Sequence, residues 1–133
     1  LERSGHSHSD VMVVPISKMH LFLCLGKSLA EARGLRIAAY GHLGDGNLHL
    51  NRLAATSEER EQAAALRGVL LDLALSLGGT LTAEHGIGLT KRDELLREQS
   101  PELIALQRRI KRAFDPHGIM NPGKVWPVSE DAS

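Results

Sequence analysis

The scarcity of several residue types limits what this 133-residue chain can do. Its single cysteine, Cys24, cannot form an internal disulfide, which is typical of a reducing compartment such as the cytoplasm or, in a eukaryote, the mitochondrial matrix. Aromatic residues make up 3% of the chain, too few for the stacking platforms of a protein that binds single-stranded nucleic acid. The 16 basic and 16 acidic residues balance, so charge gives no basis for binding nucleic acid or an anionic membrane. No apolar run approaches the roughly 20 residues of a membrane span.

The most informative segment is 40–51, Tyr-Gly-His-Leu-Gly-Asp-Gly-Asn-Leu-His-Leu-Asn. Asp-Gly is a strong signal for a two-residue β-hairpin turn, so we expect Asp45 and Gly46 at the tip. This register places His42 directly opposite His49, with Tyr40 and Asn51 on the same face because side chains alternate along a strand. The opposite face carries apolar side chains suited to packing on helices: Ala39, Leu43, Leu48 and Leu50.

Hydrophobic periodicity and turn signals predict the remaining elements. A β-rich run at 10–15 precedes a helix that is expected to begin with Ser17 as its N-cap and to run to about residue 32. The apolar stripe of this helix includes Cys24 and is expected to bury it. Thr56 and Glu59 form a capping box before a second helix, and a short strand follows at 80–83. Two further helices follow, one near 91–97 and one from 100 to 114 with Ser100 as its N-cap. The order predicts an α+β fold, a ferredoxin-like split βαβ antiparallel sheet with helices on one face and C-terminal helices added. We expect one domain over 1–126 and a disordered tail over 127–133.

The predicted sheet brings possible metal ligands together. Two imidazoles on one face are typical ligands of Zn²⁺, and also of Mn²⁺ or Fe²⁺. Glu84 ends the strand predicted at 80–83, and its carboxylate would complete a set of His42, His49 and Glu84. Such a set leaves coordination positions open for water or substrate. The alternative is a surface hairpin with two solvated histidines, since polar faces are common on antiparallel sheets.

The residues after Glu84 allow more than one interpretation. His85 is suited to act as a general base because imidazole titrates near neutral pH, although its place in the sequence also fits an ordinary loop histidine. Gly86 and Gly88 permit a close backbone approach to a ligand, or simply a turn. The segment 121–124, Asn-Pro-Gly-Lys, reads as a turn.

Three segments together resemble a known family. They are 41–51 (GHLGDGNLHLN), 83–88 (AEHGIG) and 114–124 (FDPHGIMNPGK), in that order. The chain is similar, over about residues 8 to 126, to the C-terminal part of FAD-linked oxidases that act on D-2-hydroxy acids. That family includes D-2-hydroxyglutarate dehydrogenase, D-lactate dehydrogenase and the glycolate oxidase D subunit.

The resemblance implies a cap that closes over a flavin bound by a preceding domain. By this similarity His42, His49 and Glu84 hold a divalent metal, Zn²⁺ or Mn²⁺, which binds the carboxylate and α-hydroxyl oxygens of the substrate. His85 takes the hydroxyl proton and also contacts the substrate, Asn51 hydrogen-bonds the substrate, and hydride passes to FAD. Gly86 and Asn121 lie near the cofactor. The implied partners are a small 2-hydroxy acid and a flavin-binding domain in the same or another chain, and a homodimer is allowed for.

Two departures from the family pattern affect what is expected. The chain contains no FAD-binding half, so we expect a fragment or a separate cap that does not turn over alone. His8 stands where the hydroxyglutarate branch carries a lysine, two residues before Asp10, and this leaves the substrate side chain open. Two alternatives remain, a non-catalytic ferredoxin-like metal-binding module and a free-standing metal hydrolase that uses His42, His49 and Glu84.

Overall fold

The computed structural model of the chain describes residues 6–126, so the disordered tail expected over 127–133 lies outside the described residues. The chain divides into two compact units, Leu1–Glu84 and His85–Ser133, and each is described by itself. Among the residues that the structure describes, no helix is long and apolar enough to cross a membrane.

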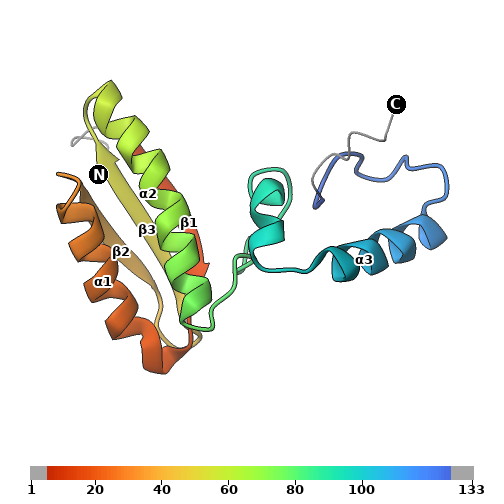
Figure 1. Ribbon diagram of the computed structural model, residues 1–133, viewed down its shortest axis with the longest axis horizontal. Helices are drawn as coiled ribbons and strands as arrows, with labels where there is room; N and C mark the ends of the chain where they lie inside the picture. The colour runs from red at the N-terminus through yellow and green to blue at the C-terminus, as the bar shows by residue number, and fades with distance from the viewer. Residues whose placement is uncertain (1–5, 127–133) are drawn as a thin grey trace. The chain divides into compact units, whose positions relative to one another are not determined.

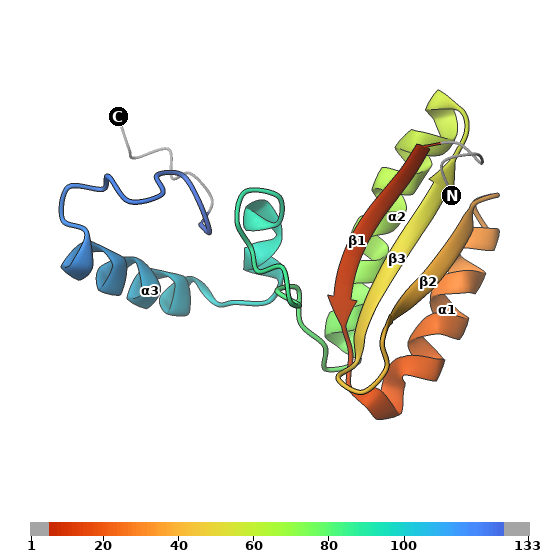
Figure 2. The same ribbon diagram turned by 180° about the vertical axis from the view of Figure 1, so that it is seen from behind.

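The first unit is an antiparallel three-stranded sheet with two helices on one face (Figures 1 and 2). The strands are β1 (His6–Val13), β2 (Arg36–His42) and β3 (Asn47–Ala54), and their order in the sheet is β1-β3-β2. The helix α1 (Met19–Glu31) connects β1 to β2, and the helix α2 (Ser57–Ser76) follows β3. Figure 2 shows the sheet in front of both helices, so its other face is not covered by them. This arrangement confirms the predicted α+β class.

The fourth predicted strand is present only as a single bridge. Thr80 pairs with Val13, and the two residues exchange backbone hydrogen bonds of 3.0 and 3.4 Å. The bridge places Thr80 beside β1, where the fourth strand of a ferredoxin-like sheet lies. The chain turns away at once, and Ala83 adopts a left-handed conformation (φ 46°) that a continuing strand would not allow.

The predicted hairpin register is wrong by two residues. Tyr40, not His42, is the partner of His49, and His42 pairs with Asn47 at the end of the ladder. The connection is a loop at 43–46, longer than the predicted two-residue tip. Leu43 therefore leaves the apolar face and is 69% exposed. Because side chains repeat every two residues along a strand, the shift kept both histidines on the predicted face.

The main core lies between the sheet and the two helices. Leu48 and Leu50 of β3 point into it, as predicted, and meet Phe22 of α1 and Leu66 and Leu70 of α2.

The capping box of Thr56 and Glu59 is present at the start of α2. The predicted cap at Ser17 is absent: a 3₁₀ turn, η2 (Ile16–Lys18), precedes α1. Cys24 is exposed rather than buried, because the core-facing stripe of α1 is instead formed by Met19, Phe22, Gly26 and Ala30.

A charged group is buried within the same unit. Asp10 of β1 accepts a hydrogen bond from Nε of Arg67 on α2, and its Oδ2 lies 3.7 Å from Nη2 of Arg52 on β3. Arg52 is 2% exposed, and burial lowers its pKa, although the Asp10 charge opposes this effect. The group connects α2 to two strands, and removing Asp10 would leave two cations without their shared carboxylate.

The second unit is helical. It contains a 3₁₀ helix, η3 (Arg92–Arg97), where a short helix was predicted, and α3 (Pro101–Phe114) with the predicted Ser100 cap. Its small core joins Ile87, Leu95 and Ile104. Asp115, at the end of α3, is 5% exposed and accepts hydrogen bonds from Lys111 Nζ (2.5 Å) and from the backbone N–H groups of Ile119 (3.1 Å) and Met120 (2.9 Å). The hydrogen bond from Lys111 is the main reason why the pKa of Asp115 lies below its usual range.

Candidate metal site

The two histidines lie at neighbouring positions on the sheet face that the helices leave open. His42 is the last residue of β2, and His49 is near the start of β3. In the observed register they are diagonal neighbours, with ring centroids 6.2 Å apart and planes at 72°. They are therefore close enough to share an ion, although they are not the directly opposed pair that the sequence predicted.

The loop at 43–46 sets this diagonal arrangement. Asp45 Oδ1 accepts a hydrogen bond from the backbone N–H of Asn47 (3.0 Å), an interaction that favours a turn. Gly46 adopts φ 77°, and its carbonyl accepts a 3.2 Å hydrogen bond from the N–H of Val14 after β1. A Cβ at Gly46 would lie 2.0 Å from the Val14 carbonyl oxygen, so only glycine fits there. The loop is thus fixed by a contact with a distant strand.

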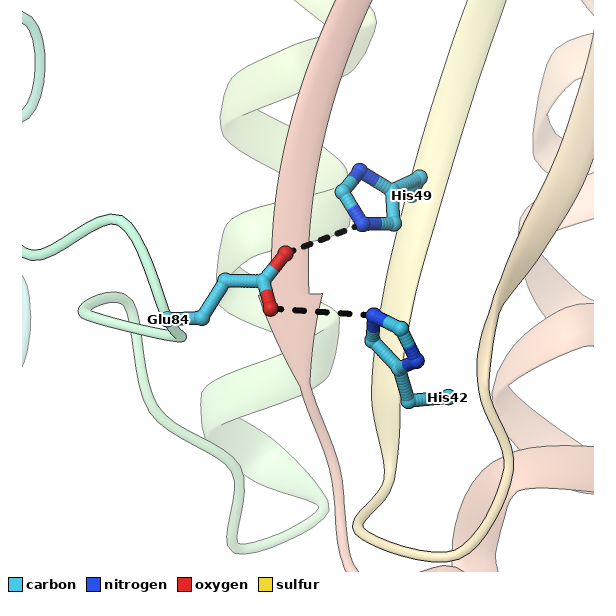
Figure 3. A group of neighbouring side chains, drawn as sticks. All are labelled: His42, His49 and Glu84. Carbon is cyan, nitrogen blue, oxygen red and sulfur yellow. Dashed lines mark ion pairs between the residues drawn. The ribbon is translucent and has the colours of Figure 1, made fainter.

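Glu84 completes the group. Its Oε1 lies 3.1 Å from Nε2 of His49, and its Oε2 lies 3.7 Å from Nε2 of His42. Figure 3 shows the carboxylate pointing at both imidazoles, with one oxygen directed to each. One ligand atom from each residue can be chosen so that all three lie within 4.8 Å of one another. The structure therefore brings together the three residues that the sequence predicted as ligands.

The three side chains differ in exposure. His49 is 16% exposed, Glu84 40% and His42 63%, so the group has a buried end and an open end. Two imidazole nitrogens and a carboxylate oxygen suit Zn²⁺ and Mn²⁺, and three protein ligands leave coordination positions for other molecules. The residues present thus fit a divalent metal of the catalytic type.

Two buried amides flank His49 on the same face of β3. Asn47 and Asn51 are each 3% exposed, and the Oδ1 atom of each has no hydrogen-bond partner in the part of the chain that the structure describes. Unpaired buried acceptors are costly, so each oxygen is suited to receive a donor from water or from a bound molecule. Asn51 was predicted from the sequence, whereas Asn47 was explained only as part of the hairpin.

The other predicted site residues belong to the second unit. His85 is exposed and follows Glu84 directly in the chain. Gly86 has φ 69° and open space around its Cα, as a close backbone approach to a ligand requires. Asn121 has φ 50°, and its side-chain oxygen accepts a 3.2 Å hydrogen bond from Lys124. Their roles stay predictions.

Sequence reasoning gave no role to Tyr40. Its ring is stacked on the ring of His49, with centroids 4.9 Å apart and planes within 3° of parallel. The predicted register opposed Tyr40 to Asn51, so the contact could be found only once the loop length was known. An aromatic residue on the histidine face was the available signal.

Comparison with known proteins places the chain in a family. Residues 7–125 match the family described as FAD linked oxidases, C-terminal domain. The chain is 45% identical over 112 residues to a D-lactate dehydrogenase of Archaeoglobus fulgidus, covering 84% of this chain and 25% of that protein. It is 40% identical over 94 residues to a D-2-hydroxyglutarate dehydrogenase of Stutzerimonas stutzeri, covering 68% and 20%. It is 38% identical over 117 residues to a mitochondrial D-lactate dehydrogenase [cytochrome] of Kluyveromyces lactis, covering 88% and 20%.

The match extends over both units of the chain but over only a part of each relative. The chain spans 20% to 25% of the length of these three curated relatives. The matched residues include His42, His49 and Glu84, together with the second unit up to residue 125. The chain therefore belongs to the family of FAD-linked oxidases and corresponds to their C-terminal domain.

Proposed function

We propose that the chain is the metal- and substrate-binding cap of an FAD-dependent dehydrogenase that oxidises a small D-2-hydroxy acid to the 2-oxo acid. The observation that carries the proposal is the convergence of His42, His49 and Glu84, whose ligand atoms lie within 4.8 Å of one another. A domain that only covered a flavin would have no need of this group.

Each residue has a distinct part in the proposed chemistry. His42, His49 and Glu84 hold Zn²⁺ or Mn²⁺, with positions left for the carboxylate and α-hydroxyl oxygens of the substrate. The metal would supply Lewis-acid polarisation of these oxygens, and FAD would supply a hydride acceptor. Asn51 would hydrogen-bond the substrate, a role supported by its buried Oδ1, which has no hydrogen-bond partner among the described residues. His85 takes the proton of the α-hydroxyl group and contacts the substrate.

The flavin would be held mainly by a domain outside this chain, with Gly86 and Asn121 close to it. The relatives extend far beyond the matched segment, since the match covers 25% of the length of the Archaeoglobus protein. Several large apolar side chains in the second unit are exposed, as expected where another domain covers them. They include Leu103, Leu106, Ile110 and Phe114 of α3, together with Ile119.

The substrate class is proposed only as far as a small D-2-hydroxy acid. A relative named D-lactate dehydrogenase matches 84% of the chain, and one named D-2-hydroxyglutarate dehydrogenase matches 68%. His8 replaces the lysine expected in the hydroxyglutarate branch, which favours a substrate without a second carboxylate.

Elemental analysis of the purified chain tests the metal site. We expect up to one zinc or manganese per chain and no flavin absorbance in the visible spectrum. His49→Ala should lower the metal content, whereas His20→Ala, a change of an exposed histidine on α1, should not. Metal content that is unchanged in the double variant His42→Ala/His49→Ala would contradict the site assignment.

A chimera tests the activity. The matched segment of the Archaeoglobus fulgidus D-lactate dehydrogenase is replaced by this chain, and reduction of an artificial electron acceptor is measured with D-lactate and other D-2-hydroxy acids. We expect turnover that falls by more than about 100-fold in Glu84→Gln, since loss of an outer partner of a metal ligand already costs about 10–100-fold. We expect His85→Asn to lower kcat by about 10²-fold or more.

The chimera also separates the proposal from its main alternative. A chimera that folds, binds FAD and metal, and oxidises none of these acids would indicate a non-catalytic metal-binding module. Equal activity of Glu84→Gln and the unchanged chimera would contradict a role of the metal in turnover.

A further inference from the structure

Tyr40, on the edge strand β2, contacts His49 of the candidate metal site. Tyr40 on β2 and His49 on β3 are direct partners in the ladder, and both side chains lie on the open face of the sheet. Their rings are stacked at 4.9 Å with an interplanar angle of 3°. Parallel rings at this distance form the offset stack that aromatic pairs favour over a face-to-face sandwich.

The stack distinguishes the two histidines. The side chain of His49 is 16% exposed, whereas that of His42, which meets its neighbour only edge-on at 6.2 Å, is 63% exposed. One imidazole is therefore confined between neighbouring groups, while the other stands at the open end of the strand. The orientation of His49 decides which ring atom faces Glu84, because a half-turn of the ring about its Cβ–Cγ bond would put Cε1 in the place of Nε2.

We propose that Tyr40 is a positioning residue for the metal centre. Its ring holds the imidazole of His49 in the orientation that directs Nε2 at the Glu84 carboxylate, 3.1 Å away. This inference rests on the proposed metal site. A ligand that is ordered before the ion arrives loses less conformational freedom on binding, so the stack raises metal affinity without contacting the metal.

The exposure of Tyr40 makes the proposal separable from fold stability. Tyr40 is 54% exposed and is not among the buried residues of the main core, so loss of its ring should leave the packing of the helices on the sheet intact. Other residues with high β-propensity can replace it without disturbing the strand β2. The effect of the ring on metal binding can therefore be measured in a folded chain.

The test is a titration of the full chain with Zn²⁺ and Mn²⁺ against a competing chelator. Tyr40→Phe keeps the ring and should bind within about twofold of the unchanged chain. Tyr40→Leu and Tyr40→Thr remove the ring and should bind about tenfold more weakly, as expected for loss of a group that orients a ligand. Leu43→Ala, which removes an exposed apolar side chain from the neighbouring loop, is the matched control and should have no effect.

A spectroscopic measurement on the metal-free chain tests the stack directly. The ring protons of His49 should be shifted upfield by the Tyr40 ring current in the unchanged chain and in Tyr40→Phe, and this shift should disappear in Tyr40→Leu. The signals are assigned by their loss in His49→Gln. Circular dichroism checks that each variant folds, and Tyr40→Thr carries the comparison if Tyr40→Leu does not.

The outcomes distinguish the positioning role of Tyr40 from the proposed metal site on which it rests. Failure of the unchanged chain to bind either metal would contradict the metal site itself. Binding by the unchanged chain with equal affinity in Tyr40→Leu, or a shift that survives in that variant, would overturn only the positioning role of Tyr40. Tenfold weaker binding together with loss of the shift would support it.

Discussion

The two units of the chain are held together in different ways. In the first unit, the described residues include a core of fifteen buried hydrophobic side chains between a sheet and two helices. In the second, the corresponding core joins three, Ile87, Leu95 and Ile104. Polar contacts join other parts of the second unit: those of Asp115, the 2.9 Å hydrogen bond from Arg92 to the Gly123 carbonyl and the 3.0 Å hydrogen bond from Trp126 Nε1 to Gln107.

This difference matches the division of the proposed chemistry. The three predicted metal ligands all belong to the first unit, where two come from strands backed by the large core. Ligands on rigid elements keep their geometry without the metal. His85 and Asn121 belong to the unit with the small core, where local opening should cost less free energy. The comparison predicts that perturbing one unit will affect metal binding and perturbing the other will not.

Core truncations should show the largest contrast. Leu66 is fully buried in the first unit, so Leu66→Ala should lower the free energy of unfolding by about 2–5 kcal/mol. Ile104→Ala should cost less, because the smaller core around it can relax or admit water. Hydrogen exchange of backbone amides reports each unit separately. Equal loss of protection in both units for both variants would show that they unfold as one.

The hairpin loop should give an intermediate effect that is confined to the first unit. Gly46→Ala places a methyl group against the Val14 carbonyl and forces a left-handed alanine, so it should cost about 1–3 kcal/mol and weaken metal binding by displacing His42. Gly44→Ala is the matched control, since a Cβ there meets open space, and should stay within about 0.5 kcal/mol. Thermal unfolding and zinc titration measure the two effects. Similar results for both variants would rule out the close contact at Gly46.

Acidification should give the smallest effect, and in the second unit it should act at Asp115. The pKa of Asp115 is lowered in the folded chain, chiefly by the hydrogen bond from Lys111, so its contribution to stability is complete above the unfolded pKa of about 4. That contribution is lost as the pH falls through the lower folded pKa. The protection of the Ile119 and Met120 amides, measured as hydrogen exchange relative to the intrinsic rate at each pH, should therefore decrease below about pH 4. Asp115→Asn should remove this pH dependence, whereas Asp93→Asn, at a 76% exposed side chain, should retain it.

Local patterns in the sequence predicted the fold class and the convergence of His42, His49 and Glu84, because these depend on alternation and on element order. Two histidines an odd number of residues apart share a hairpin face in either register, so His42 and His49 were predicted to lie on one face despite the wrong turn. The loop length was not predictable locally, because the hydrogen bond from Val14 to Gly46 fixes it from another strand. The contact of Tyr40 with His49 follows from that loop length and was missed for the same reason.

Burial of charge was the other feature that sequence reasoning missed. Arg52 continues the inward alternation of Leu48 and Leu50, and this pattern was a signal that its side chain would be buried. The buried charge of Arg52 is compensated by Asp10, which is far away in the sequence but whose Oδ2 lies 3.7 Å from Nη2 of Arg52. Pairings of this kind arise from the sheet order, which a single sequence does not reveal.

The single bridge between Thr80 and Val13 has a consequence for how a metal would act on the chain. Beyond that bridge, Glu84 is attached to the sheet by its contacts with His42 and His49 and by a segment that includes the strained Ala83. An ion shared by the three side chains would act as a cross-link between the hairpin and the point where the first unit ends. Metal occupancy would then stiffen the last residues of the first unit, which are otherwise joined to the sheet by little regular structure.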